Sequence, residues 1–119
     1  MKTPDSFWIS SKEAISKIRK DGSDLLKLSQ YGNLTFDIYK PRGTDRQQPH
    51  DKDEIYMVIS GKGILNSNNK RTNCNQGDIL FVPAGTEHYF ESFSNDFCTW
   101  AIFSNPAKAE QLASNSINP

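Results

Sequence analysis

The sequence predicts an all-β domain with one short helix near its N-terminal end. Apolar and β-branched residues occur in short runs of about four to eight residues, and Gly, Pro or Asn residues separate the runs. Only one segment carries the start and stop signals of a helix. The chain has 119 residues, which is the usual length of one domain, so we expect a single domain over residues 1–119 with its barrel core at about 24–103.

The N-terminal third predicts the helix and a first pair of strands. Ser10-Ser11 followed by Glu13 is typical of a helix start, which predicts a helix over about residues 11–20 that ends at Asp21-Gly22. Residues 24–29 and 34–40 alternate in the manner of paired strands, and residues 31–33 join them. Residues 41–49 are polar, and we expect a loop there.

The rest of the chain predicts six further strands. Residues 55–59 indicate a buried strand, and Gly61 and Gly63 bracket a tight turn after it. We expect one hairpin between residues 64–66 and 70–74 and another between 89–93 and 97–103. Residues 79–82 indicate a short strand between turns at 77–78 and 83–85. Residues 104–119 are polar, and we expect a fraying tail with at most a helical turn at 107–112.

Composition excludes several classes of protein. Lys plus Arg number 14 and Asp plus Glu number 14, so no basic field indicates a nucleic acid or an anionic membrane as partner. No apolar run approaches the roughly 20 residues needed to cross a bilayer. Residues 1–5 lack the apolar region of a signal peptide, and we expect a cytoplasmic protein. The two cysteines, Cys74 and Cys98, then read as structural or incidental thiols rather than a disulfide.

Both histidines of the chain lie close to acidic and glycine-rich turn sequences. Gln48 and His50 are two residues apart, so on an extended segment their side chains share a face, and Glu54 opens the next strand. His88 follows the turn at 83–85. Imidazole and carboxylate groups bind divalent transition metals, and two His with one carboxylate on neighbouring strands would leave positions open for water or substrate. Each residue alone has a simpler reading as a surface or hydrogen-bonded side chain.

The second of these segments resembles one of the two signature motifs of the cupin superfamily. Gly77, Pro83, Gly85 and His88 stand at the spacing of that motif. Its closing Asn is replaced by Ser92.

The first segment resembles the other cupin motif from its end backward. Glu54 and Gly61 have the motif spacing, and His50 stands four residues before Glu54, at the place of the second histidine of the motif. Gln48 occupies the place of its first histidine, which is a departure.

The resemblance covers roughly residues 34–103 and implies a fold and a site. The fold is a small double-stranded β-helix, the cupin jelly-roll barrel. Carried over to this chain, the metal ligands are His50, Glu54 and His88, with Gln48 as a weaker fourth. The implied cofactor is one divalent metal ion, such as Fe, Mn, Zn or Ni. The alternative is a cupin that keeps the barrel and has lost useful metal affinity.

Aromatic residues indicate the character of the cavity. Tyr56 shares a strand face with Glu54, and Phe90 shares one with His88. On the strand at 34–40 either Phe36 and Ile38 or Thr35, Asp37 and Tyr39 face inward, and the sequence leaves this open. Tyr56, Phe90 and Phe36 are therefore expected to line a pocket for a small, partly hydrophobic ligand. The alternative is that these rings only pack the barrel.

Two classes of function follow from the resemblance. One is a metal-dependent enzyme of dioxygenase, isomerase or lyase type, for which Tyr56 and Glu87 are the nearby candidates for a base. The other is a non-catalytic cupin that binds or senses a small molecule. The chain has one convincing helix, so a helix-turn-helix transcription factor is excluded.

The N-terminal apolar cluster Phe7-Trp8-Ile9 indicates an interface. Such a cluster needs cover, either on its own barrel or on that of a partner. We expect a homodimer with a two-fold contact built from barrel strands, with Phe7 and Trp8 at or near it.

Overall fold

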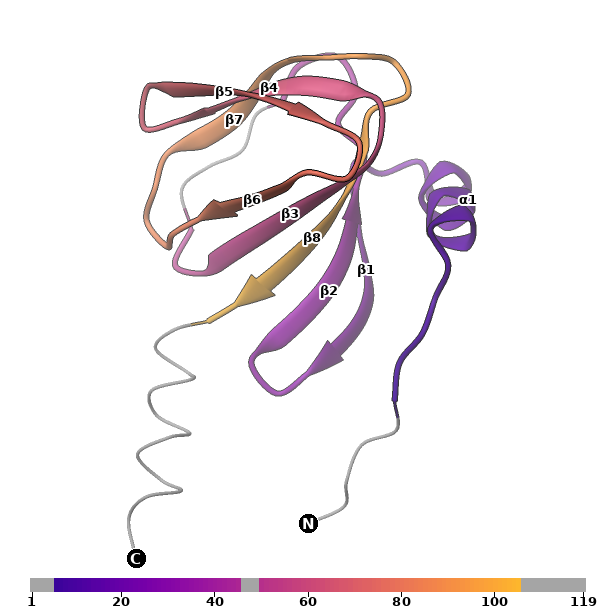
Figure 1. Ribbon diagram of the computed structural model, residues 1–119. Helices are drawn as coiled ribbons and strands as arrows, with labels where there is room; N and C mark the ends of the chain where they lie inside the picture. The colour runs from indigo at the N-terminus through magenta and orange to yellow at the C-terminus, as the bar shows by residue number, and fades with distance from the viewer. Residues whose placement is uncertain (1–5, 46–49, 106–119) are drawn as a thin grey trace, which may run out of the picture.

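The protein is an antiparallel β-barrel made of two sheets that face each other (Figure 1). The computed structural model describes residues 6–45 and 50–105. One sheet has the strand order β1-β2-β8-β3-β6, and the other has the order β5-β4-β7. The predicted all-β jelly roll is confirmed. The strands are β1 (Leu25–Tyr31), β2 (Leu34–Tyr39), β3 (Asp53–Ser60), β4 (Lys62–Ser67), β5 (Lys70–Asn75), β6 (Ile79–Val82), β7 (His88–Phe93) and β8 (Cys98–Ser104).

Helix α1 (Ser11–Asp21) begins and ends where its capping residues predict. The Oγ of Ser10 accepts a hydrogen bond from the backbone N–H of Glu13 at 3.1 Å. At the other end Gly22 has a φ of 80°, and its N–H donates to the carbonyl of Ile18 at 3.0 Å. This left-handed conformation suits glycine, so the helix stops there.

Helix α1 lies outside the larger sheet, next to β1 and β2 (Figure 1). Ala14 and Ile18 of the helix form a buried cluster with Ile38 of β2 and Cys98 of β8. Because neighbouring residues of a strand point to opposite faces, Ile38 turned toward the helix places Asp37 and Tyr39 on the inner face. The register that the sequence left open is thereby decided.

Two of the predicted hairpins are confirmed. β1 pairs with β2, from Leu25 opposite Tyr39 to Tyr31 opposite Leu34. β4 pairs with β5 across Asn68 and Asn69, whose φ angles are 51° and 67°. Positive φ at both central residues is what a tight hairpin turn requires, and Asn tolerates it better than most residues.

The predicted hairpin between residues 89–93 and 97–103 is wrong. β7 pairs with β4 in the smaller sheet, whereas β8 lies between β2 and β3 in the larger one. The connecting residues cross from one sheet to the other beside Gly61, and the N–H of Ser94 donates to the carbonyl of Lys62 at 2.9 Å. Phe97 follows the turn and is fully buried against Phe90, with ring centroids 4.9 Å apart. Burial of this ring inside the barrel requires the crossing.

Strand β3 is buried on one face only, which corrects the prediction of a buried strand. Tyr56 and Val58 point into the barrel and are 0% and 2% exposed. Ile55 and Met57 point outward and are each 37% exposed. The apolar run therefore serves two faces, the barrel interior and an outer apolar surface.

The main core fills the space between the sheets. It contains Tyr39, Tyr56, Val58, Leu65, Cys74, Val82, Phe90, Phe97 and Ala101. Cys74 in this core and Cys98 under the helix are free thiols. Over residues 6–45 and 50–105, no helix has the length and apolar character to cross a membrane. The tail expected at 104–119 lies outside the described residues, apart from Ser104, the last residue of β8, and Asn105.

Candidate metal centre

Hydrogen bonds from backbone N–H groups hold the two motif segments together at one end of the barrel. The turn at residues 83–85 lies against the segment that leads into β3. The N–H of Gly85 donates to the carbonyl of His50 at 2.7 Å, and the N–H of Ala84 donates to Oδ1 of Asp53 at 2.9 Å. Gly85 of the second motif and Asp53, the residue before Glu54, thus fix where His50 enters the barrel relative to His88.

His50, Glu54 and His88 converge on one point. Oε1 of Glu54 lies 3.1 Å from Nε2 of His50 and 3.1 Å from Nε2 of His88. One ligand atom from each of the three residues lies within 4.8 Å of the others. Glu54 and His88 are each 1% exposed, whereas the side chain of His50 is 25% exposed. The site is therefore closed on its inner side and reachable past His50.

The sequence suggested that the three residues lie on neighbouring strands, and the structure corrects this. Glu54 belongs to the larger sheet, and His88 is the first residue of β7 in the smaller one. They meet across the barrel interior, because both side chains point inward from facing sheets.

The tautomer of His88 is set by the backbone. Its Nδ1 donates to the carbonyl of Thr86 at 2.9 Å, so in the neutral ring Nε2 carries a lone pair. That lone pair faces the carboxylate oxygen of Glu54, and two acceptors at 3.1 Å need either a proton or a metal ion between them. Burial lowers the pKa of His88, but hydrogen bonds to Glu54 and Thr86 and the charges of Glu54 and Asp45 outweigh it, and the net pKa is raised.

These donor atoms fit a divalent metal ion. Two imidazole nitrogens and one carboxylate oxygen are a common donor set for Fe, Mn, Zn and Ni. Ligand atoms about 2.1 Å from one ion and at right angles to each other lie roughly 3.0 Å apart, which is close to the 3.1 Å found here. The bond from His88 to Thr86 is the outer hydrogen bond that orients a ligating histidine. Gln48 lies outside the described residues.

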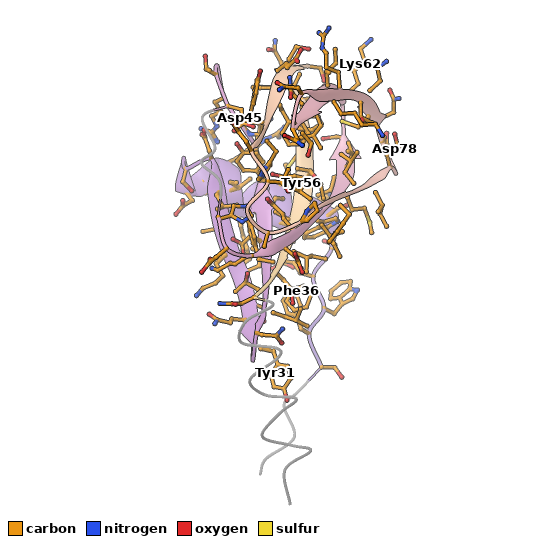
Figure 2. All side chains as sticks on the ribbon, turned by 90° about the vertical axis from the view of Figure 1, so that its left-hand side faces the viewer. Tyr31, Phe36, Asp45, Tyr56, Lys62 and Asp78 are labelled. Carbon is orange, nitrogen blue, oxygen red and sulfur yellow. The ribbon has the colours of Figure 1, made fainter. Side chains whose placement is uncertain are left out.

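Aromatic rings surround the site unequally. The ring of Tyr56, which lies in the middle of the barrel in Figure 2, is 6.2 Å from that of His88. Phe103 lies 5.5 Å from His50 and is a neighbour that the sequence did not indicate. Phe90 lies behind Tyr56 at 5.0 Å and is 1% exposed, so it packs the barrel beneath the site.

The expectation that Phe36 lines the pocket is wrong. Phe36 points to the outer face of the larger sheet, where its ring lies 5.8 Å from that of Phe7 (Figure 2). The reason is the same alternation that turns Ile38 toward the helix. Glu87, a candidate base in the sequence, is exposed.

Two buried carboxylates in the barrel were missed. Asp45 is 6% exposed, accepts a hydrogen bond from the hydroxyl of Tyr39, and accepts one from the N–H of Phe90 at 2.7 Å. These hydrogen bonds tie Asp45 to β2 and to β7. Asp37 is 7% exposed and lies on the inner face of β2. Asp45 lies in a polar loop segment, where the sequence pattern does not indicate which side chains are buried. Asp37 could not be assigned to the interior because the sequence left the inward face of β2 open.

The fold and the convergent site define a cupin. The model of the family described as Cupin domain matches residues 36–103, more than half of the chain, and the protein belongs to this family. A cupin 2 conserved barrel domain protein from Salinispora arenicola has the same fold, with a TM-score of 0.58, 19% sequence identity, and coverage of 76% of this chain and 82% of that one.

Two relatives are similar in sequence. An uncharacterized protein of Streptomyces coelicolor is 38% identical over 63 residues, which cover 53% of this chain and 60% of that protein. An acireductone dioxygenase of a Synechococcus species is 29% identical over 110 residues, which cover 79% of this chain and 54% of that enzyme. The chain thus spans little more than half the length of these relatives.

Proposed function

We propose that this protein is a metal-dependent enzyme that acts on a small organic molecule at the site formed by His50, Glu54 and His88. The observation that carries the proposal is the carboxylate oxygen of Glu54 at 3.1 Å from Nε2 of both histidines, with His88 fixed in the ligating tautomer by Thr86. A bound divalent ion would supply a Lewis acid and, as iron, a redox centre. His50, Glu54 and His88 would hold it and leave positions open.

The reaction type that we favour is a dioxygenation. Relatives that match most of this chain are acireductone dioxygenases, although each is longer than the chain. Tyr56 and Phe103 give the site an apolar wall on two sides, which suits a small, partly hydrophobic substrate.

Metal analysis tests the first half of the proposal. Protein purified without a chelating tag is expected to contain about one equivalent of Fe, Mn, Zn or Ni. Oxygen uptake by the iron-loaded form, with acireductones, diketones, phenols and small thiols as candidate substrates, tests the second half. Metal binding without oxygen uptake would instead support the non-catalytic binding cupin.

Variants identify the ligands. His88→Ala is expected to lose the metal while the far-ultraviolet circular dichroism of the barrel is retained, because the ring makes one of the three bonds to the ion. Gln48→Ala should weaken metal binding less than His50→Ala, since a neutral amide oxygen is a poorer ligand than imidazole, and Gln48→His should tighten it. Full metal content in His88→Ala would contradict the assignment.

We also propose that the protein is a homodimer that pairs through the outer face of its larger sheet. Four outward side chains form cross-strand pairs on β3 and β6, with Ile55 opposite Phe81 and Met57 opposite Ile79. Phe81 and Ile79 are 59% and 62% exposed. Trp8, beside the same sheet, is 82% exposed. An apolar face of this extent is typical of a surface that another copy covers. The cytoplasmic location stays a prediction.

A further inference from the structure

Asp37 is a carboxyl group inside the barrel that the proposed metal centre does not use. It lies on β2 opposite Ala101 of β8, and Ala101 lies opposite Tyr56 of β3. These three residues form one row across the inner face of the larger sheet, with Glu54 two residues from Tyr56 on the same face. Neighbouring strands are about 4.8 Å apart, so Asp37 and Tyr56 are separated by roughly 10 Å. The residue between them has only a methyl side chain, so no long side chain of this row stands between Asp37 and Tyr56.

The buried oxygen of Asp37 lacks a partner. Asp37 is 7% exposed, and its Oδ1 has no hydrogen-bond partner among the residues that the structure describes. A buried acceptor without a donor costs free energy, so native structures seldom keep one without a use for it.

The nearest candidate for an ion pair is engaged elsewhere. Lys27 of β1 lies directly opposite Asp37, but its Nζ donates to Oε1 of Gln30 at 2.8 Å. Within the described residues no ion pair joins Lys27 to Asp37. A structural role as half of a salt bridge therefore does not account for the burial of this carboxyl group.

The charges around Asp37 come from three elements of the barrel. Burial raises its pKa to about 6, the charge of Glu54 on β3 adds to the rise, and Lys27 on β1 and Lys52 before β3 oppose it. Asp37 and Glu54 thus share one interior with two cations near its rim. Such a site disfavours a further carboxylate and favours a neutral group that donates a hydrogen bond.

We propose that Asp37 is a substrate-binding residue, which accepts a hydrogen bond from a hydroxyl group of a ligand whose other oxygen is held at the His50, Glu54 and His88 site. The substrate class is accordingly a small hydroxylated molecule, such as an enediol, a hydroxyketone or a catechol, rather than a carboxylic acid. This inference rests on the proposed function and adds to it the feature by which the site selects its substrate.

A coloured probe tests the inference without turnover. The zinc-loaded protein is titrated with 4-nitrocatechol, whose absorbance changes when its hydroxyl groups bind. Asp37→Leu, which removes the acceptor, is expected to weaken binding about tenfold or more, the usual effect of losing a hydrogen bond to a charged group. Asp37→Asn keeps an oxygen acceptor without the charge and should lose less. Asp51→Asn is the matched control, because this exposed carboxyl group also follows a histidine of the site directly in sequence, and it should change affinity less than twofold.

The affinity for oxalate distinguishes a substrate-binding role of Asp37 from a purely structural one. It offers carboxylate oxygens and no hydroxyl proton, so Asp37→Asn should bind it more tightly than the wild-type protein, the opposite direction to 4-nitrocatechol. Zinc content is measured in every variant and should stay at the wild-type level. Equal 4-nitrocatechol affinity in the wild type, Asp37→Leu and Asp37→Asn, or no binding by the zinc-loaded wild type, would overturn the inference alone. A wild-type protein that binds no divalent metal would overturn the proposed function and the inference with it.

Discussion

Single residues at this site are arranged for binding rather than for stability. The ionised form of Asp37 lacks a partner for Oδ1, and Nε2 of His88 faces a carboxylate oxygen. The unpaired oxygen of Asp37 costs free energy in the ligand-free protein, and the contact of His88 with Glu54 is favourable only with a proton or a metal ion between the two atoms. A metal ion at His88 and a hydroxyl group at Asp37 would satisfy both residues. At binding sites of this kind, a substitution that removes the unpaired group often raises stability and lowers function.

The first prediction concerns Asp37 and pH. Its folded pKa of about 6 lies above the ordinary value of 3.8, so between these values the folded state binds a proton that the unfolded chain lacks. The cost of the ionised carboxylate is therefore absent below about pH 4, grows as the pH rises, and is complete above about pH 6. Asp37→Asn should raise the free energy of unfolding at pH 8 by about 1–3 kcal/mol and lose this advantage at pH 4.

Urea denaturation of metal-free wild-type and variant proteins at the two pH values measures this difference. Asp51→Asn is the control, because Asp51 is exposed and its neutralisation should change little at either pH. A gain in Asp37→Asn that is the same at pH 4 and pH 8 would show that ionisation of Asp37 is not the cause.

At the scale of elements, the crossing from β7 to β8 is what turns a run of hairpins into a barrel. It passes so close to the turn between β3 and β4 that only glycine fits at position 61. A Cβ atom there would lie 2.5 Å from Oγ of Ser94 and 2.8 Å from Cα of Phe97. The φ of Gly61 is also +75°, which an L side chain rarely adopts.

The second prediction follows from this contact. Gly61→Ala should lower the free energy of unfolding by about 2–4 kcal/mol, because backbone strain and overpacking add. Gly77→Ala is the matched control. Gly77 has a φ of +90° with no atom within 4 Å of the added Cβ, so it should cost only the strain, about 1–2 kcal/mol. If urea denaturation shows that both variants lose the same free energy of unfolding, the segment between β7 and β8 shifts to accommodate the added methyl group and the prediction is wrong.

At the scale of the whole molecule, the two faces of the larger sheet are treated differently. Its inner face closes the barrel, and helix α1 covers part of its outer face through Ile38 and Cys98. The outer face of β3 and β6 is apolar and exposed at Ile55, Met57, Ile79 and Phe81. A second copy of the chain that packs on these side chains would bury the part of the outer face that helix α1 leaves exposed.

The third prediction tests this pairing. Phe81→Glu should convert the proposed homodimer to a monomer at micromolar concentration, since a charge would be buried at the centre of the proposed contact. Tyr31→Glu is the control, because Tyr31 is similarly exposed, at 55%, but lies on β1 at the other edge of the sheet. Light scattering gives the mass of each protein. A wild-type monomer, or a dimer that Phe81→Glu leaves intact, would contradict the proposed interface.

Features that depend on near neighbours in the chain could be predicted from the amino-acid sequence. The caps of α1 at Ser10 and Gly22 and the turn at Asn68-Asn69 are local, because each is set by the conformation and hydrogen bonds of a few consecutive residues. The spacing of Gly77, Pro83, Gly85 and His88 was likewise enough to indicate a cupin, since these residues set the turns and the position of the histidine within one short segment.

The inward face of a strand and the pairing of strands could not be predicted in this way, because they depend on packing between elements that are distant in sequence. Phe36 and Ile38 share one face of the strand at 34–40 and Asp37 and Tyr39 share the other, and it is the helix packed on Ile38 that turns Phe36 outward and Asp37 inward. Residues 94–97 carry the same turn signals whether they close a hairpin or cross between sheets, and burial of Phe97 inside the barrel selects the crossing. In both cases the deciding energy is the burial of side chains against elements distant in sequence, which no short window of the chain contains.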